Sequence, residues 1–84
     1  MKVIEGTVVR SAAGRDKGDF QVIVKIEPGF VWVCDGRHRP LGKIKKKKII
    51  HLYLTNTVLD VKNLRTNKLI RCSLREFMDK LNKN

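Results

Sequence analysis

A short charged loop bounded by two glycines constrains the fold of this 84-residue chain more than any other segment. The loop is Gly14-Arg15-Asp16-Lys17-Gly18, and residues 8–10 and 20–25 on either side alternate in the period-two pattern of strands with one packed face. Both glycines accept a positive φ, so the backbone can turn tightly while Arg15 and Lys17 project from it. We therefore predict a hairpin whose tip is accessible to a ligand.

Turn signals divide the following segment into further short strands. In Glu27-Pro28-Gly29, proline fixes φ at the first central position and glycine accepts the positive φ of a type II turn. A strand at Arg37–Leu41 would have to lie at a sheet edge, because Pro40 has no N–H to donate to a neighbouring strand. A basic loop is expected at Gly42–Lys48. We predict a small β-barrel with five strands, at Lys2–Arg10, Phe20–Ile26, Phe30–Cys34, Arg37–Leu41 and Ile49–Leu54.

The pattern becomes helical after Thr55. Ser73 and Glu76 have the spacing of a capping box, and the apolar residues after Ser73 recur every three or four positions, which predicts a helix over 74–81. Thr57–Leu64 fits a short helix slightly better than a strand. The expected fold is mainly β with a C-terminal helix, in one domain that consists of a barrel at 1–55 and a basic helical extension at 56–84 packed on it.

The net charge of +11 predicts a large anionic partner. The excess is uneven, since residues 35–51 contain seven basic and one acidic side chain. No apolar stretch approaches the roughly 20 residues that span a bilayer, and the N-terminus lacks the apolar region of a secretory signal. We expect a cytoplasmic protein without membrane contacts, monomeric when free.

The segment Glu5–Gly18, followed by Val22–Ile26 and Phe30–Gly36, resembles the KOW motif of ribosomal proteins and transcription elongation factors. It is most similar to the ribosomal protein fourteen-e kind and to small bacterial KOW proteins. The resemblance covers residues 4–36 best. It implies an SH3-like barrel that binds RNA, usually ribosomal RNA within the ribosome, through the glycine loop and nearby loops. Ribosomal proteins are further possible partners on the same ground.

Two groups of residues are therefore candidates for RNA contact. Arginine grips a phosphate bidentately, whereas lysine acts as a point charge, so Arg15 is the best candidate for a fixed contact. A lysine run adds affinity and salt dependence rather than sequence choice. The alternative is that both groups are only solvated loops. The loop group is Arg10, Gly14, Arg15, Lys17 and Gly18; the second group is Arg37, Arg39, Lys43, Lys45, Lys46, Lys47 and Lys48.

Trp32 is the only tryptophan and lies in the middle of a predicted strand. Phe30, Trp32 and Cys34 share one face of that strand, and Val31 and Val33 the other. We expect the valines in the core. Trp32 is then free either to stack on an RNA base or to pack internally.

The sequence does not favour catalysis or a cofactor. Cys34 and Cys72 are far apart, and only His38 lies near a cysteine, so the spacing does not match a zinc site and both thiols are expected to be free and buried. No histidine lies near a serine or cysteine in a context that suggests activation. Two other functions stay open: an SH3-like module that binds peptides through aromatic side chains, and an accessory of transcription elongation.

Overall fold

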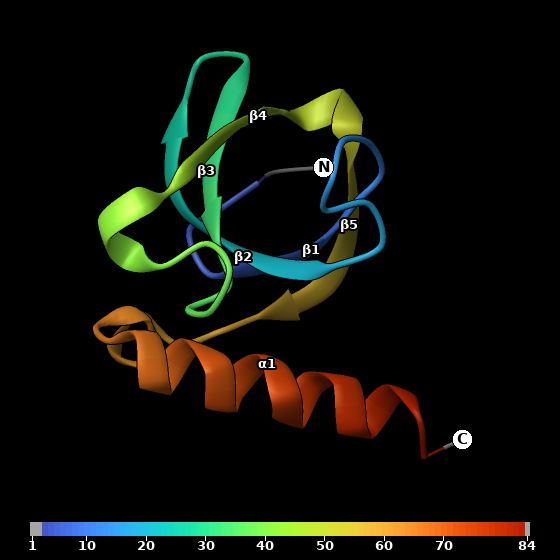
Figure 1. Cartoon of the computed structure of the whole chain (residues 1–84), viewed down its shortest axis with the longest axis vertical. Coiled ribbons are helices and arrows are strands. Elements are labelled where there is room, and N and C mark those ends of the chain that lie inside the picture. Colours follow the sequence, from blue (N-terminus) through green and yellow to red (C-terminus); the bar gives the residue numbers. More distant parts are fainter. Residues whose placement is uncertain (1–2, 84) are drawn as a thin grey trace.

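Five strands form one antiparallel sheet, and a helix follows at the C-terminus (Figure 1). This computed structural model describes residues 3–83. The order across the sheet is β4-β3-β2-β1-β5. The mainly β fold with a C-terminal helix is thereby confirmed. The elements are β1 (Thr7–Ser11), β2 (Phe20–Glu27), β3 (Phe30–Cys34), β4 (Lys45–Lys48), β5 (Leu52–Val58) and α1 (Asn67–Leu81).

The sheet is strongly curved but open. The pairing register shifts between Ile23 and Lys25 in β2, and again between Thr7 and Val9 in β1. Irregularities of this kind bend a strand and increase its twist. The sheet consequently curls towards a ring in Figure 1. Within residues 3–83, β4 and β5 do not pair with each other, so the fold is barrel-like without being a closed barrel.

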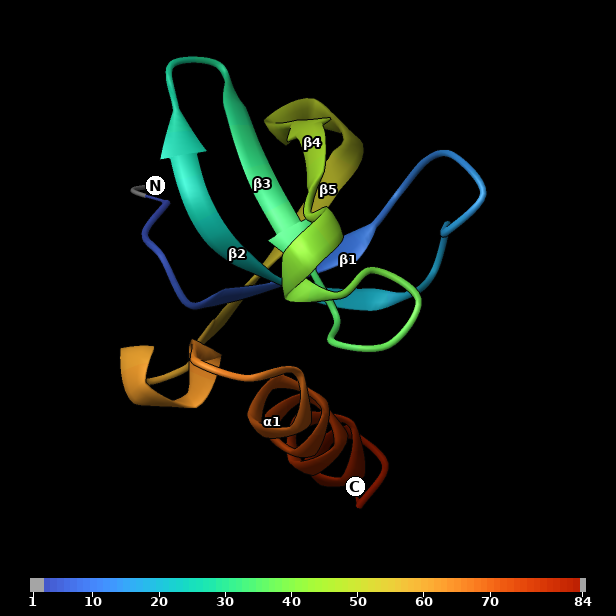
Figure 2. The ribbon, with the colours of Figure 1, turned by 60° about the vertical axis from the view of Figure 1, so that its left-hand side comes forward.

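Both faces of the central strands are buried. Side chains alternate between the two faces of a strand, so Val9 and Ile23 lie in the concave core whereas Val8 and Val22 lie beneath α1. Figure 2 shows the helix packed across the convex side of the sheet. The concave core contains Val9, Ile23, Val31, Val33 and Leu52, and the core beneath the helix contains Val8, Val22, Cys34, Ile70 and Leu74.

The helix begins almost two turns before the predicted start. Thr66 is the N-cap, and its hydroxyl accepts a hydrogen bond from the Leu69 amide at 3.1 Å. Ser73 lies inside the helix, so the prediction of a capping box at Ser73 is wrong. The earlier start is favoured because it places Ile70 in the apolar stripe one turn before Leu74, and Ile70 is completely buried.

Two predictions for the middle of the chain are wrong. Arg37–Leu41 forms no strand, and the chain instead turns and enters a 3-10 helix at Leu41–Lys43. The loop expected at Gly42–Lys48 contains strand β4. The four lysines of β4 pair with Phe30–Val33 of β3, so cross-strand hydrogen bonding outweighs the weak strand propensity of lysine.

The remaining elements agree in part with the prediction. The Pro28-Gly29 turn is confirmed, with Gly29 at φ +80°. β1 begins at Thr7; Lys2, where its start was predicted, lies outside the described residues. The closing strand begins at Leu52, because Ile49–His51 forms a 3-10 helix. In the segment expected to be helical, Thr57 and Val58 complete β5, and a 3-10 helix at Val61–Leu64 follows.

Candidate nucleic-acid interface

The glycine loop is a rigid structure. Gly14 and Gly18 have φ of +89° and +93°, as the turn was predicted to require. The Gly18 amide donates to the Ser11 carbonyl at 2.8 Å, and the Ser11 amide donates to the Asp19 carbonyl at 2.9 Å. These bonds extend the β1–β2 ladder to the base of the loop. Arg15 and Lys17 are exposed on a tip that the backbone holds in one shape.

The middle residue of the tip faces inwards. The carboxylate of Asp16 accepts hydrogen bonds from the Ser11 hydroxyl and the Gln21 amide, each at 2.8 Å. The Lys47 ammonium, from the far edge of the sheet, forms an ion pair with the same carboxylate at 2.6 Å. It also donates to the Ala13 carbonyl at 3.2 Å. This buried polar network ties the loop to β4.

The network corrects the prediction for Lys47. That side chain is only 6% exposed and the Asp16 side chain 16%, so Lys47 is not a solvated charge like its neighbours. Its register opposite Val31 directs it into the concave core. Burial alone would raise the pKa of Asp16, but the hydrogen bonds from Lys47, Gln21 and Ser11 outweigh that effect and hold the pKa well below its usual range. Lys47 therefore positions the loop and is not free for RNA.

The first basic groove lies between the glycine loop and β4. It has a volume of ≈ 440 Å³, and Ala13 and Gly14 form one side. The exposed Lys46 and Lys48, with the half-buried Lys45, form the other. The glycine loop and the lysine run, about 30 residues apart in the sequence, thus lie side by side. The lysine side chains face the backbone of the loop.

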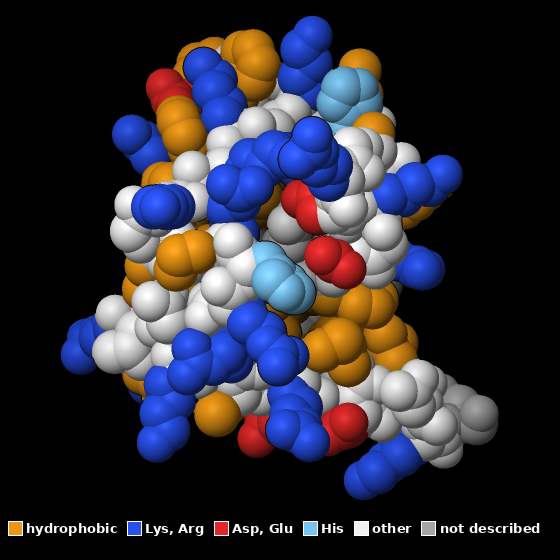
Figure 3. All heavy atoms as spheres, in the orientation of Figure 1, with side chains coloured by type: hydrophobic (Ala, Val, Ile, Leu, Met, Phe, Trp, Pro, Cys, Tyr) orange, Lys and Arg blue, Asp and Glu red, His pale blue; other side chains and the backbone are white. Residues whose placement is uncertain are grey.

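The second basic groove lies on the other side of the loop, against the helix. It has a volume of ≈ 570 Å³ and includes Gly18 and Asp19 from the loop and Arg37 from the segment after β3. Sequence reasoning missed the three basic residues that α1 contributes here, although their spacing of three and four places them on one helix face. They are Lys68, Arg71 and Arg75. Figure 3 shows basic side chains spread over this side of the molecule, from the sheet to the helix.

Trp32 lies on the convex face of β3, half-buried, while Val31 and Val33 are completely buried as predicted. Its neighbours across the sheet are Lys25 on β2 and Lys46 on β4, whose ammonium groups lie 5.8 and 5.9 Å from the ring centre. The indole N–H donates to Glu27, and this hydrogen bond lowers the pKa of the Glu27 carboxyl. The ring is part of a basic surface but is already engaged by these neighbours.

The remaining predicted RNA-binding residues lie beside the glycine loop and in the segment between β3 and β4. Arg10 is exposed, and its Nε donates to the Gly18 carbonyl at 3.2 Å. The amides of Arg37 and Arg39 both donate to the Asp35 carboxylate at 2.8 Å, which fixes the turn that carries them. Arg39 is half-buried and Lys43 exposed, and neither lines the two basic grooves.

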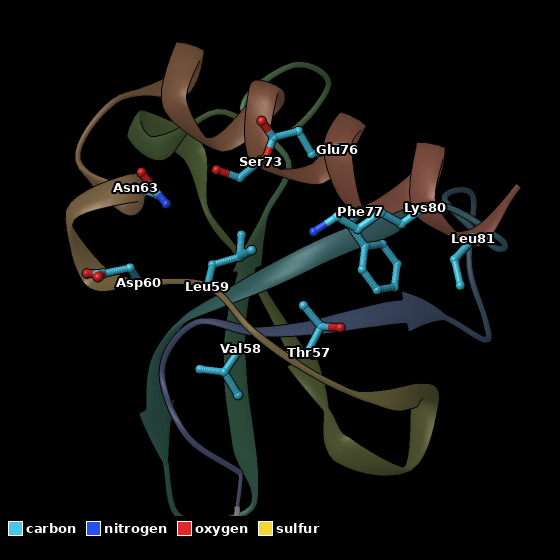
Figure 4. A pocket seen from close by; sticks show the side chains of 10 residues that line it. All are labelled: Thr57, Val58, Leu59, Asp60, Asn63, Ser73, Glu76, Phe77, Lys80 and Leu81. Carbon is cyan, nitrogen blue, oxygen red and sulfur yellow. The ribbon is translucent and has the colours of Figure 1, made fainter. Parts of the chain in front are cut away.

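A further hollow, between α1 and the segment Thr57–Asn63, has a different character (Figure 4). It contains Lys80 but also the carboxylates of Asp60 and Glu76. A polyanion would meet net negative charge there, so this hollow is less suitable for nucleic acid than the two basic grooves.

The two cysteines lie in different environments. Burial, with a smaller contribution from Asp35, raises the pKa of the Cys34 thiol to about 11, which disfavours the thiolate that zinc requires. Cys72 is exposed, so the expectation that both thiols are buried is wrong for it. Residues 3–83 contain no group of three or more potential metal ligands. In the same range, no helix is both long and apolar enough to cross a membrane.

The chain matches no family model and no curated protein sequence.

Proposed function

We propose that this protein binds RNA, and that its barrel-like sheet is an SH3-like fold of the KOW type. The supporting observation is that a rigid glycine loop separates two basic grooves. Ala13 and Gly14 border one groove and Gly18 and Asp19 border the other, so Arg15 and Lys17 lie between two surfaces that can hold phosphates. Backbone amides and basic side chains of this kind fix the register of a protein on nucleic acid.

Ribosomal RNA is the RNA that we propose. The KOW-like sequence of the first half of the chain supports this choice, and a ribosomal role would place the protein in the cytoplasm. We propose binding rather than catalysis, since both grooves present several cations to a polyanion.

A salt titration with two lysine variants tests the proposal. For an RNA hairpin, log K should fall with log salt with a slope of magnitude about 4 to 6, because about five or six phosphates displace counterions. Lys48→Gln should reduce the slope by about 1, since Lys48 borders the first groove. Lys80→Gln removes the same charge from the mixed-charge hollow and should leave the slope unchanged.

Fluorescence anisotropy at four or five salt concentrations measures all three slopes. A slope near zero for the parent protein would contradict RNA binding of this kind. Equal reductions for the two variants would contradict the placement of the RNA on the first groove.

A further inference from the structure

An arginine lies between two aromatic residues in one row across three strands. Arg10 on β1 is the cross-strand partner of Phe20 on β2 and of Tyr53 on β5. The row is on the convex face, next to the row of Val8 and Val22 that α1 covers. Tyr53 is on an edge strand and 65% of it is exposed. Core packing therefore does not account for Tyr53.

The last turns of α1 form one wall of a groove over this row. Phe77 packs edge-on against Phe20, with the ring centres 5.2 Å apart and an angle of 68° between the planes. Leu81 is one turn further along the helix and 51% exposed. Figure 4 shows both side chains projecting from α1 on the side where Thr57 lies. The groove has a volume of ≈ 670 Å³, which is within the range of small-molecule sites, about 300–1,000 Å³.

The opposite wall is an irregular part of β5. Thr7 pairs with Val58 but Val9 pairs with Leu54, so Thr55–Thr57 bulges out of the ladder. The Thr55 hydroxyl donates to the Val8 carbonyl at 2.6 Å and accepts from the Thr57 amide at 3.2 Å, which fixes the bulge. Asn56 is exposed at its centre and lines the groove. A bulge redirects side chains, and an amide side chain can both donate to and accept from the edge of a base.

We propose that this groove binds an unpaired nucleobase of RNA, stacked on Tyr53, with the neighbouring phosphate on Arg10. The inference rests on the proposed function, and it adds that the preferred RNA contains a single-stranded nucleotide. Aromatic rings are the usual platforms for unpaired bases, and the Watson–Crick edge of a base needs polar partners such as Asn56.

The position of Arg10 favours a nucleotide over an apolar peptide. Its guanidinium lies 5.6 Å from the Phe20 ring centre, and its Nε is held by the Gly18 carbonyl. Arg10 also lines the groove, and a guanidinium in that place can grip a phosphate. Phe20 lines both this groove and the second basic groove, so an RNA strand can continue from one groove to the other.

Two oligonucleotides of equal length and charge separate base stacking from phosphate binding. One is a single-stranded RNA octamer, and the other is the same backbone without bases. Tyr53→Ala should weaken binding of the intact octamer about 5- to 20-fold, towards the lower end of the effect of removing a stacking aromatic residue. Binding of the abasic octamer should be unchanged, and Tyr53→Phe should retain the parent affinity for both.

Ile50→Ala is the matched control, because Ile50 is 81% exposed and does not line the groove. It should affect neither oligonucleotide, and thermal melting should show that all variants remain folded. If the parent protein binds both octamers equally, or if Tyr53→Ala weakens both equally, the groove does not bind a base, while the proposed RNA binding stands. If the parent binds neither octamer nor the hairpin, both proposals are wrong.

Discussion

Replacing Lys47 by methionine should lower the free energy of unfolding by about 2–3 kcal/mol, which for a domain of this size lowers Tm by about 10–20 °C. Methionine keeps most of the buried stem of lysine but removes the ammonium. The Asp16 carboxylate would then lose its counterion and keep only its bonds to Ser11 and Gln21. Thermal and urea denaturation followed by circular dichroism measure the loss.

Lys48→Met is the control for this prediction. Lys48 is the next residue of β4 but is exposed, so its replacement should change stability by no more than about 0.5 kcal/mol. The double variant Asp16→Asn with Lys47→Met should lose less than the sum of the two single losses, because it leaves no unpaired buried charge. Equal stability of the Lys47 and Lys48 variants would show that the network does not stabilise the loop.

Replacing Gly36 by alanine should have a larger effect than replacing Lys47 by methionine, a loss of about 3 kcal/mol or more. Gly36 has φ +75°, which strains any other residue, and a β-carbon would lie 2.4 Å from the Asn67 carbonyl oxygen at the start of α1. The helix would have to move away from the sheet. This would expose part of the core around Ile70 and Leu74 and break the Arg71 bond to the Gly36 carbonyl.

Gly29→Ala separates backbone strain from the steric clash. Gly29 has a similar φ of +80°, but a β-carbon there would meet no heavy atom within 4 Å. Its loss should be about 1 kcal/mol, as for backbone strain alone. Denaturation curves that place the two glycine variants at the same stability would contradict close packing of α1 on Gly36.

The sequence predicts those parts of the fold that local signals determine. The Pro28-Gly29 turn, the strand at Phe30–Cys34 and the positive φ of Gly14 and Gly18 depend on the conformational preferences of a few adjacent residues. The alternation of Val31 and Val33 with Trp32 likewise indicates which residues enter the core. The helix is predicted from its apolar stripe, and only its start is wrong, because Ile70 adds a buried position before Ser73.

The parts that the sequence did not predict depend on pairing between segments that are far apart in the chain. Four consecutive lysines carry no period-two pattern, so neither the strand nor the inward side chain can be read from them. The register with β3 places Lys47, rather than Lys46 or Lys48, in the core beside Asp16. The second groove was not predicted because it depends on the early start of α1 and on the packing of α1 near Arg37. Its one signal in the sequence was the spacing of Lys68, Arg71 and Arg75.

The RNA-binding surface can be located most directly by titrating the ¹⁵N-labelled protein with an RNA hairpin that has a single-stranded loop, and following the backbone amides by NMR. Saturable shifts are expected in the segments that line or lie between the two basic grooves, which are residues 14–18, 45–48 and 68–75. The turn at Pro28-Gly29 and the segment 60–63 should remain unperturbed. Shifts confined to that turn and segment, or no saturable shifts at all, would contradict the proposed interface.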